Sequence, residues 1–337
     1  MSETTKISYV DSTWNPWYGC AHVSPGCENC FAERWAERTK FVEWGRGKPR
    51  RPASEAKWRE ARRWNDAPWL CDKCGHAHES TQGDVGSCVG CEARGCFHKR
   101  RILVDLCDPF DPNVPAEWLA RFLGLIKDTP NLIWYLLTKR PEKWRFRISI
   151  AHDFIGKPGE EFLCQWLAGN PPSNVRLGVS VEDQQWADER IPALLAIPAA
   201  FRWVSFEPLL GPINVSKTVS VPKWKASANM LSRTGFAVIG GESCKPRAKA
   251  RPCNIEWIRS LVRQCVAAGV PVHVKQLGSR PVDDNAIGAD QFQDKVCWPH
   301  GTESDGKHIF IGHWQGGDPA EWPEDLRVRE FPEVRDA

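Results

Sequence analysis

The sequence has no apolar run long enough to cross a bilayer, and its first residues, MSETTKISYVDST, are polar. We therefore expect no membrane span, no secretory signal and a cytoplasmic protein. Charge of one sign is also scarce, because 45 Lys and Arg against 42 Asp and Glu give a formal net charge of +3. This balance excludes a protein that holds nucleic acid by overall charge alone, so any basic surface must be local.

Disulfide bonds are not expected, although the chain contains 14 Cys. Disulfide-rich scaffolds are small secreted chains, whereas this chain has 337 residues and no apparent leader. Seven of the cysteines stand instead at spacings typical of metal ligands. Metal binding therefore explains them better.

Three cysteines, Cys20, Cys27 and Cys30, lie close together in the stretch TWNPWYGCAHVSPGCENCFAE. A CxxC pair can face one metal, and a third thiol can close the loop over it. With three thiolates, a [4Fe-4S] cluster keeps one iron open, and S-adenosylmethionine is its expected occupant. Zinc is the alternative, with His22 as a fourth ligand. The spacing alone leaves both metals open.

A second group of cysteines indicates a zinc ribbon. Cys71-x2-Cys74 is followed, after thirteen residues, by Cys88-x2-Cys91. Two such knuckles supply four thiolates to one tetrahedral zinc ion. Because a closed site has no open position, its role should be structural or in binding a partner. We expect residues 70–100 to form a small inserted module.

From residue 100 on, short apolar runs alternate with helical periodicity, which is typical of βα units. A parallel sheet follows, either doubly wound or a complete or partial (β/α) barrel. The strands are expected at 7–10, 101–106, 132–137, 175–179, 201–205, 236–239 and 270–274, with helices at 115–128, 188–195 and 255–268. The expected organisation is a first strand, cysteine loop and basic segment in 1–69, the ribbon in 70–100, the remaining βα units in 101–278 and a loop-rich extension in 279–337.

Charged or small polar residues follow nearly every expected strand. In parallel α/β folds this carboxyl edge is where ligands bind, so we expect these residues to line one site. The expected lining is Asp105, Asp108, Thr138, Lys139, Arg140, Ser180, Glu182, Glu207, Gly241, Glu242, Lys275 and Gln276.

The segment between Phe31 and Asn65 has a local excess of positive charge. It contains eleven Arg and Lys against five Glu, with four Trp interleaved. Basic and aromatic residues together suit a nucleic acid or another phosphate-bearing ligand. The alternative is a solvated helix face with Trp side chains that pack into the core.

At this point several motifs carry a family resemblance. TWNPWYGCAHVSPGCENCFAER, LLTKRP, LGVSVEDQ, VSFEPLLGP, VIGGES and VKQLG resemble a family of phage and bacterial proteins sometimes called three-Cys-motif proteins, from about Ile7 to Gly278. That family in turn looks like a distant relative of radical S-adenosylmethionine enzymes such as the spore photoproduct lyase group.

The resemblance implies a partial (β/α) barrel of radical type, with Cys20, Cys27 and Cys30 as ligands of a [4Fe-4S] cluster that Phe31 shields. Two departures stand out. The first gap of the cysteine motif has six residues instead of three, and Gly240-Gly241-Glu242, which resembles the triplet that binds the cofactor's amino group, follows a late strand. The cofactor-binding residues expected are Ser180, Glu182, Glu207, Gly240, Gly241 and Glu242.

The working hypothesis is a radical S-adenosylmethionine-type enzyme that removes a hydrogen atom from a nucleic acid or nucleotide. Such chemistry needs no Ser-His-Asp or paired-carboxylate signature, and the sequence shows none. The catalytic candidates are Lys139, Glu182, Glu207 and Lys275, with Arg140 as a further ligand for anionic groups. An electron donor such as flavodoxin or ferredoxin would be a partner.

Two alternatives belong to other classes of protein. One is a non-catalytic, zinc-dependent nucleic-acid-binding or adaptor protein with both cysteine groups structural. The other is a magnesium-dependent hydrolase or nuclease that uses Asp105, Asp108, Glu182 and Glu207.

Overall fold

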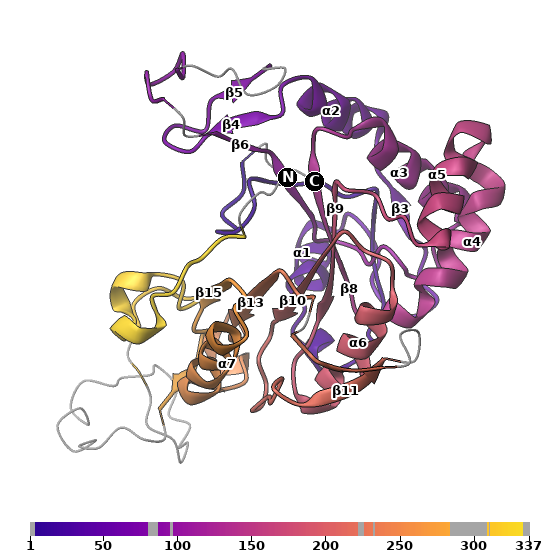
Figure 1. The fold of residues 1–337 in the computed structure, drawn as a ribbon. Helices are drawn as coiled ribbons and strands as arrows, with labels where there is room; N and C mark the ends of the chain where they lie inside the picture. Colours follow the sequence, from indigo (N-terminus) through magenta and orange to yellow (C-terminus); the bar gives the residue numbers. More distant parts are fainter. Residues whose placement is uncertain are drawn as a thin grey trace, which may run out of the picture.

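A sheet of seven parallel strands forms the centre of the computed structural model, in the order β1-β7-β8-β9-β10-β13-β15. Neighbouring strands follow each other along the chain, and the helices between them cover the outside of the sheet (Figure 1). Among the described strands β1 and β15 do not pair, so the sheet is an open half-barrel. The structure describes residues 4–79, 87–94, 97–221, 226–231, 233–283, 309 and 311–332.

The expected α/β class with a partial parallel barrel is confirmed, and most expected elements lie within a few residues of the observed ones. The sheet contains β1 (Ser12–Thr13), β7 (Arg101–Val104), β8 (Ile133–Thr138), β9 (Val175–Ser180), β10 (Phe201–Phe206), β13 (Phe236–Gly240) and β15 (Val272–Gln276). The α-helices are α1 (Phe31–Thr39), α2 (Glu55–Asp66), α3 (Ala116–Asp128), α4 (Trp144–Ile155), α5 (Lys157–Ala168), α6 (Gln184–Ala196) and α7 (Ile255–Ala267).

Short elements join these units. The additional strands are β2 (Trp17–Tyr18), β3 (Arg51–Pro52), β11 (Thr218–Val221), β12 (Ala226–Asn229), β14 (Cys253–Asn254) and β16 (Pro281–Val282). The 3-10 helices include η1 (Pro25–Cys27), η2 (Pro141–Lys143), η4 (Arg247–Lys249), η6 (Pro319–Glu321) and η7 (Glu324–Leu326). In the described part of the chain, no helix has the length and apolar character needed to cross a membrane.

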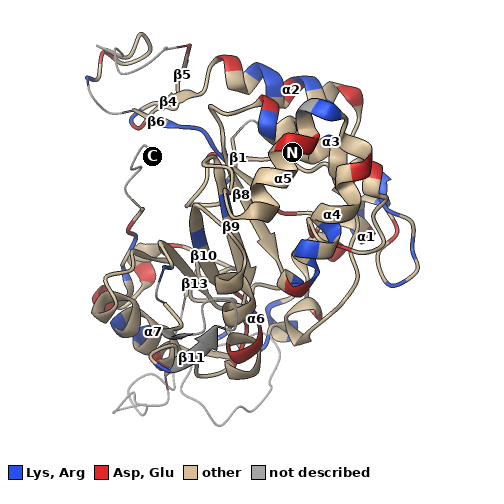
Figure 2. Cartoon of the chain, turned by 45° about the vertical axis from the view of Figure 1, so that its right-hand side comes forward, with Lys and Arg blue, Asp and Glu red and all other residues tan. Residues whose placement is uncertain are grey.

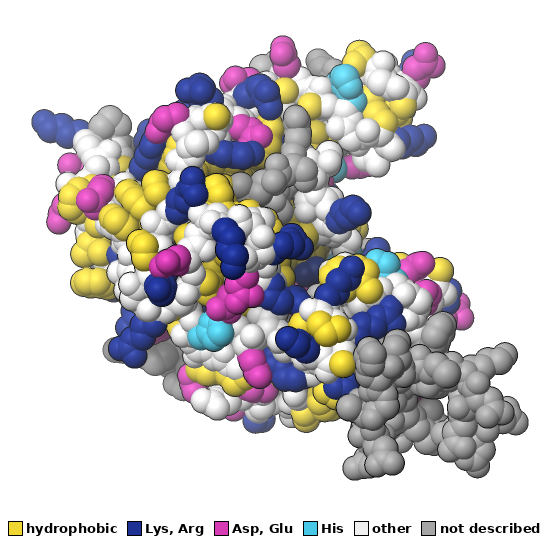
Figure 3. All heavy atoms as spheres, turned by 180° about the vertical axis from the view of Figure 1, so that it is seen from behind, with side chains coloured by type: hydrophobic (Ala, Val, Ile, Leu, Met, Phe, Trp, Pro, Cys, Tyr) yellow, Lys and Arg dark blue, Asp and Glu magenta, His cyan; other side chains and the backbone are white. Residues whose placement is uncertain are grey.

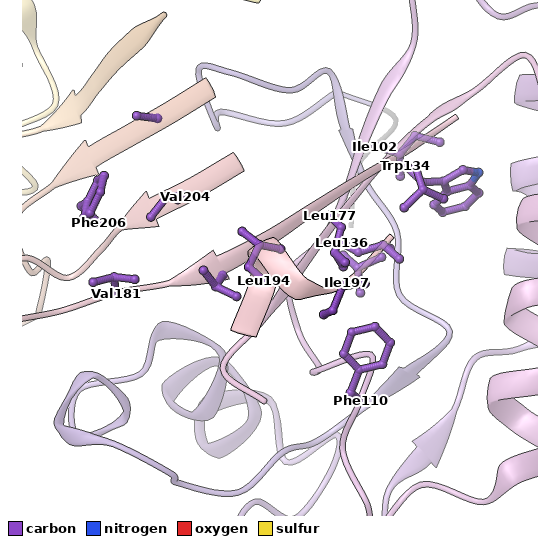
Figure 4. Packing of buried hydrophobic residues seen from close by; sticks show 14 of the residues in the cluster. Ile102, Phe110, Trp134, Leu136, Leu177, Val181, Leu194, Ile197, Val204 and Phe206 are labelled. Atoms are coloured by element: carbon purple, nitrogen blue, oxygen red, sulfur yellow. The ribbon is translucent and has the colours of Figure 1, made fainter. Parts of the chain in front are cut away.

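The outer face of the sheet packs against the helices. Alternate strand residues such as Ile102, Trp134, Leu136, Leu177 and Val204 point into this layer and are buried (Figure 4). Because residues of a strand alternate between its two faces, the intervening residues point into the half-barrel. Both faces are therefore apolar, as the continuous hydrophobic runs of a parallel sheet predict.

The inside of the half-barrel is filled toward the amino-terminal ends of the strands. Tyr135, Trp203 and Phe236 meet there, and Tyr9 packs on Trp203 with ring centroids 5.9 Å apart. The expected strand at 7–10 is therefore wrong, since Val10 N donates to Ile7 O in a turn that inserts Tyr9 into the barrel. This aromatic plug leaves a cavity at the carboxyl ends of the strands.

The cysteine-rich insertion forms a separate three-stranded antiparallel sheet in the order β5-β4-β6. Its strands are β4 (Trp69–Cys71), β5 (Ala77–His78) and β6 (Phe97–Lys99). His98 Nε2 lies 3.0 Å from Asp11 Oδ1, and Arg101 pairs with the same carboxylate at 2.9 Å. Because Asp11 and Arg101 stand at the amino-terminal edge of the sheet, the ribbon lies at the end opposite the cavity (Figure 1).

The described end of the chain packs on the exposed edge of β15. Val274 N donates to Val328 O at 2.9 Å, and His273 forms an antiparallel bridge with Arg329. Residues 284–308, 310 and 333–337 of the expected C-terminal extension lie outside the described residues. The described part thus covers an edge that would otherwise present unpaired backbone groups.

The positive charges of the segment after the cysteine loop lie mainly on the surface. Several Lys and Arg residues belong to α2 (Figure 2), and Arg59, Arg62 and Arg63 are exposed, while Trp58 and Trp64 of the same helix are buried. These Trp side chains pack into the core, as the alternative interpretation of this segment proposed. On the rear face of the molecule, Lys and Arg side chains gather toward the middle with hydrophobic side chains among them (Figure 3).

The packing around Trp203 gives the first prediction. A Cβ on Gly178 would lie 2.4 Å from the Trp203 ring, which Tyr9 and Tyr135 hold on other sides. We expect Gly178→Ala to lower the free energy of unfolding by about 2 kcal/mol, the usual cost of overpacking. Gly211→Ala is the control, because its Cβ would meet nothing closer than 3.7 Å. Urea unfolding would contradict this account if the two variants were equally stable.

Candidate functional site

A cavity opens at the carboxyl ends of the strands, where the sequence predicts a site. The lining includes residues at or just after the ends of β7, β8, β9, β10, β13 and β15, together with the cysteine loop. Of the predicted residues, these line it: Asp105, Asp108, Thr138, Lys139, Arg140, Ser180, Glu207, Gly241, Glu242, Lys275 and Gln276. Glu182 and Gly240 do not.

Cys20, Cys27 and Cys30 all line this cavity. Cys20 follows β2, Cys27 ends η1, and Cys30 is the residue before α1. These three thiols do not belong to any group of potential metal ligands whose donor atoms all lie within 4.8 Å of one another; among the described residues, only the ribbon thiols form such a group. Their three sulfurs are therefore not gathered around one point, as ligands of a single ion would be. A [4Fe-4S] cluster, in contrast, spreads its thiolates over several irons.

His22 is not placed as a zinc ligand, because it belongs to no metal-ligand group among the described residues. Its Nε2 contacts the Glu33 carboxylate, and about half of its side chain is exposed. A tetrahedral zinc ion needs four donor atoms within a few ångströms of one another, and no such group forms here among the described residues. Three thiolates on one cavity wall are a donor set that a [4Fe-4S] cluster can use.

A buried ion pair fixes the first cysteine. Arg140 Nη1 lies 2.9 Å from Asp108 Oδ2 and donates to Cys20 Sγ at 3.4 Å, while its Nη2 donates to Ala21 O at 2.9 Å. Thr138 Oγ1 also donates to Asp108, at 2.7 Å. Burial raises the pKa of Cys20 to about 12, although Arg140 acts against this shift. Arg140 is thus already paired and serves to hold the loop.

Glu182 holds the middle of the loop. Ser24 Oγ and Gly26 N donate to its Oε1, the latter at 3.2 Å, and Arg190 Nη1 pairs with Oε2 at 2.8 Å. The glutamate is fully buried, and a Cβ on Gly26 would lie 2.8 Å from it. Both carboxylate oxygens are therefore engaged within the protein, and the structure does not bring Glu182 into the cavity.

Glu242 holds the third part of the loop. It accepts hydrogen bonds from Asn29 Nδ2 and Arg251 N, each at 2.9 Å, and pairs with the Arg251 guanidinium. Although burial acts to raise its pKa, these bonds keep the pKa of Glu242 below the usual range. Asn29 lies between Cys27 and Cys30, so this glutamate positions both cysteines.

The two glycines before Glu242 are required for close packing. A Cβ on Gly241 would lie 2.2 Å from Leu277 O, and one on Gly240 would lie 2.6 Å from Glu207 Oε1. Gly240 thus leaves room for Glu207, and Gly241 lets the end of β13 approach the turn after β15. The late GGE triplet therefore has a structural function that explains its residues without a cofactor.

The floor of the cavity carries a second set of polar groups. Glu207 accepts from Ser205 Oγ at 3.2 Å and pairs with Lys275 Nζ at 3.0 Å. Asp105 Oδ1 accepts from Asn15 Nδ2 at 2.7 Å, and burial raises the pKa of Asp105 to about 6. Lys275 also lies over the Tyr9 ring, 6.0 Å from its centroid. These groups could bind the hydroxyl and amino groups of a ligand.

Lys139 differs from the other cavity cations. Its backbone N donates to Asp108 at 3.0 Å, but its ammonium group has no carboxylate partner among the described residues. Arg140 and Lys275 are paired with Asp108 and Glu207. Lys139 is therefore the cation best placed to bind an anionic group of a ligand.

Several contacts in the site were not found from the sequence. Arg190 and Arg251 lie in a helix and a loop where Arg is ordinary, so nothing in the pattern distinguished them. Cys107 belongs to neither of the two predicted groups of cysteine ligands, yet it lines the cavity, and burial raises its pKa well above the usual value. Its position directly after the strand-end motif Asp105-Leu106 was the available signal.

The ribbon thiols form a compact group at the other end of the barrel. Cys71 Sγ lies 3.6 Å from Cys91 Sγ, and Cys74 Sγ lies 3.5 Å from Cys88 Sγ. Thiolates bound to one zinc ion at about 2.3 Å in a tetrahedron are separated by nearly the same distance. The four-Cys group is thus a metal site suited to zinc.

The strand-end carboxylates do not gather around one point. Asp108, Glu182 and Glu207 each pair with their own cation, and Asp105 is bonded to Asn15. Among the described residues they form no group with donor atoms within 4.8 Å of one another. The arrangement gives no support to a magnesium site of the hydrolase type.

One protein-family model matches most of this chain. The model of a family described as "Protein of unknown function (DUF5131)" matches residues 4–310. The chain belongs to this family. The match spans the cysteine loop, the ribbon and every strand of the half-barrel. Searches of curated proteins and of solved structures each gave no significant match.

The half-buried Asp105 gives a pH-dependent prediction. Its pKa rises from 3.8 to about 6 on folding, so the folded state binds this proton more tightly than the unfolded state. This proton's stabilisation of the folded state is fully present below about pH 4 and is lost as the pH rises through 6. It amounts to about 3 kcal/mol, at 1.36 kcal/mol per pKa unit. Relative to Asp105→Asn, the wild type should lose stability over this range. The measurement is the free energy of unfolding of both proteins in urea at each pH. An equal change with pH in the two proteins would contradict the prediction.

Proposed function

We propose that this protein is a radical S-adenosylmethionine-type iron-sulfur enzyme that acts on a nucleic acid or nucleotide substrate. The observation that supports it most is the position of Cys20, Cys27 and Cys30 on the lining of one cavity, with donor atoms that do not all lie within 4.8 Å of one another. The half-barrel supports an enzyme, because ligands of such folds bind at the carboxyl ends of the strands.

The three thiolates would bind three irons of a [4Fe-4S] cluster and leave the fourth iron without a protein ligand. When bound, the cluster would pass one electron to S-adenosylmethionine, whose C5′–S bond breaks to give methionine and a 5′-deoxyadenosyl radical that takes a hydrogen atom from the substrate. Flavodoxin or ferredoxin would supply the electron. Phe31, half exposed on the cavity wall, would shield the cluster from water.

The chain's own residues would divide the binding of S-adenosylmethionine among them. Lys139 would pair with its carboxylate, and Ser180, Glu207 and Lys275 would bind its amino and hydroxyl groups. Gly241 lines the wall beside them. Glu182 and Glu242 would contribute indirectly, since their carboxylates already hold the cysteine loop.

Metal analysis tests the proposal directly. After anaerobic purification we expect about four irons and one zinc per chain, with a broad visible absorption band. Replacement of Cys20, Cys27 and Cys30 by Ala should remove the iron and the colour but leave the zinc. Cys107→Ala is the matched control from the same cavity and should keep its iron. Two zinc ions and no iron in the wild type would refute the radical chemistry and support the adaptor.

Lys139 gives a second test of the same site. Lys139→Ala should weaken the binding of S-adenosylmethionine at least about tenfold, because a charge-assisted hydrogen bond contributes about 1.5–3 kcal/mol. Lys143→Ala is the control, since its exposed side chain lies nearby in η2 outside the cavity. Equilibrium binding to protein with a full iron content is the measurement. Equal affinities for the two variants would remove Lys139 from the site.

A further inference from the structure

We infer that the rim of the cavity is a binding surface for single-stranded nucleic acid, which would present one unpaired base to the cavity. The inference rests on the proposed function and narrows its substrate from any nucleotide to a polymer. Two basic stretches carry it, and we call them the first rim segment (residues 40–51) and the second rim segment (residues 245–251).

The first rim segment continues directly from the cavity wall. Trp44 lines the cavity, and Gly45 N donates to Cys20 O at 3.0 Å. Arg50 holds the segment in place, because its Nε pairs with the buried Asp111 at 2.8 Å. Lys40 and Arg46 are exposed, and their side chains have no carboxylate partner among the described residues.

The second rim segment contacts a different part of the cysteine loop, at Pro25 and Asn29. It begins after Ser243, which lines the cavity, and reads KPRAKAR, with four cations and no acid. Lys249 O accepts from Asn29 Nδ2 at 3.1 Å, and Arg251 Nη1 donates to Pro25 O at 2.9 Å. The ammonium groups of Lys245 and Lys249 are exposed, and no described carboxylate pairs with them.

Aromatic side chains accompany these cations, which favours nucleic acid over an acidic protein. Trp44 and Phe31 lie on the cavity wall, and Phe31 is 52% exposed. Lys245 Nζ lies over the Trp314 ring, 4.2 Å from its centroid. Cations that follow a backbone, with aromatic faces on which bases stack, are typical of single-strand binding. A paired base could not enter the cavity, because its partner strand would block it.

The test measures binding without cofactor or reductant, so it does not depend on radical chemistry. Fluorescence anisotropy would follow labelled single-stranded RNA, single-stranded DNA and the matching duplexes over a range of salt concentrations. In the rim variant, Lys40, Arg46, Lys245 and Lys249 are each changed to Gln. We expect its affinity for a single strand to fall at least tenfold and its salt slope to decrease by up to about 3, at about 0.7 per lost phosphate contact.

The control variant removes the same number of charges from the outer helices. Arg59 and Arg62 of α2, Arg145 of α4 and Lys157 of α5 are all exposed and lie away from the cavity. Their change to Gln should leave affinity and salt slope close to wild type. Trp44→Ala should weaken binding without changing the salt slope, because it removes stacking and no charge.

Three outcomes would overturn the inference. Equal losses in the rim and control variants would show that binding follows overall charge. Equal affinity for single strands and duplexes would exclude a base in the cavity. If the rim variant bound oligonucleotides as tightly as the wild type but flavodoxin reduced its cluster more slowly, the rim would be assigned to a protein electron donor. Rim-dependent binding in a protein that never yields 5′-deoxyadenosine would instead refute the proposed chemistry and leave the surface established, with RNA and DNA distinguished by their relative affinities.

Discussion

The geometry of the cysteine loop depends on buried carboxylates that come from the sheet. Two of them accept hydrogen bonds from the loop and pair with a guanidinium, whereas Asp108 holds Arg140, which itself donates to Cys20 and Ala21. Breaking such a buried pair costs about 3–5 kcal/mol because a charge is left without its partner. The loop can therefore not shift independently of the strand ends. The pairs are Asp108–Arg140, Glu182–Arg190 and Glu242–Arg251.

This arrangement changes how the acidic strand ends are interpreted. A carboxylate at the end of a parallel strand is ordinarily a ligand-binding candidate. The carboxylates of Glu182 and Glu242, however, already accept hydrogen bonds within the protein. The site thereby gains fixed cysteine positions before any metal binds, which is the preorganisation that a cluster ligand set needs. Direct contact with a ligand is left to the cavity floor around Glu207 and Lys275 and to Lys139, whose ammonium group pairs with no described carboxylate.

The fold could be predicted because most strands and helices have a local apolar pattern in the sequence. The strand-end polar residues were predicted to share a cavity from the parallel connection alone, and most of them do. Segment 7–10 was misassigned because its apolar pattern suits a strand as well as a barrel plug, and only the packing of Tyr9 distinguishes the two. Helices α4 and α5 were missed, although apolar residues recur at helical spacing in α5, at Phe162, Leu163, Trp166 and Leu167. Carboxylate partners such as Arg251 were beyond reach, because pairing depends on side-chain geometry that no spacing encodes.

The two cysteine groups occupy opposite ends of the barrel, and this separates their functions. The ribbon is fixed at the amino-terminal edge through Asp11 and His98, while β7 begins at this edge and ends beside Asp105 on the cavity floor. Strands β1 and β7 connect this edge to the cavity through the packed core of the half-barrel. No described residue of the ribbon lines the cavity. If it binds nucleic acid as well, it contacts a part of the polymer remote from the reacting base, and only a long or folded strand could engage both ends.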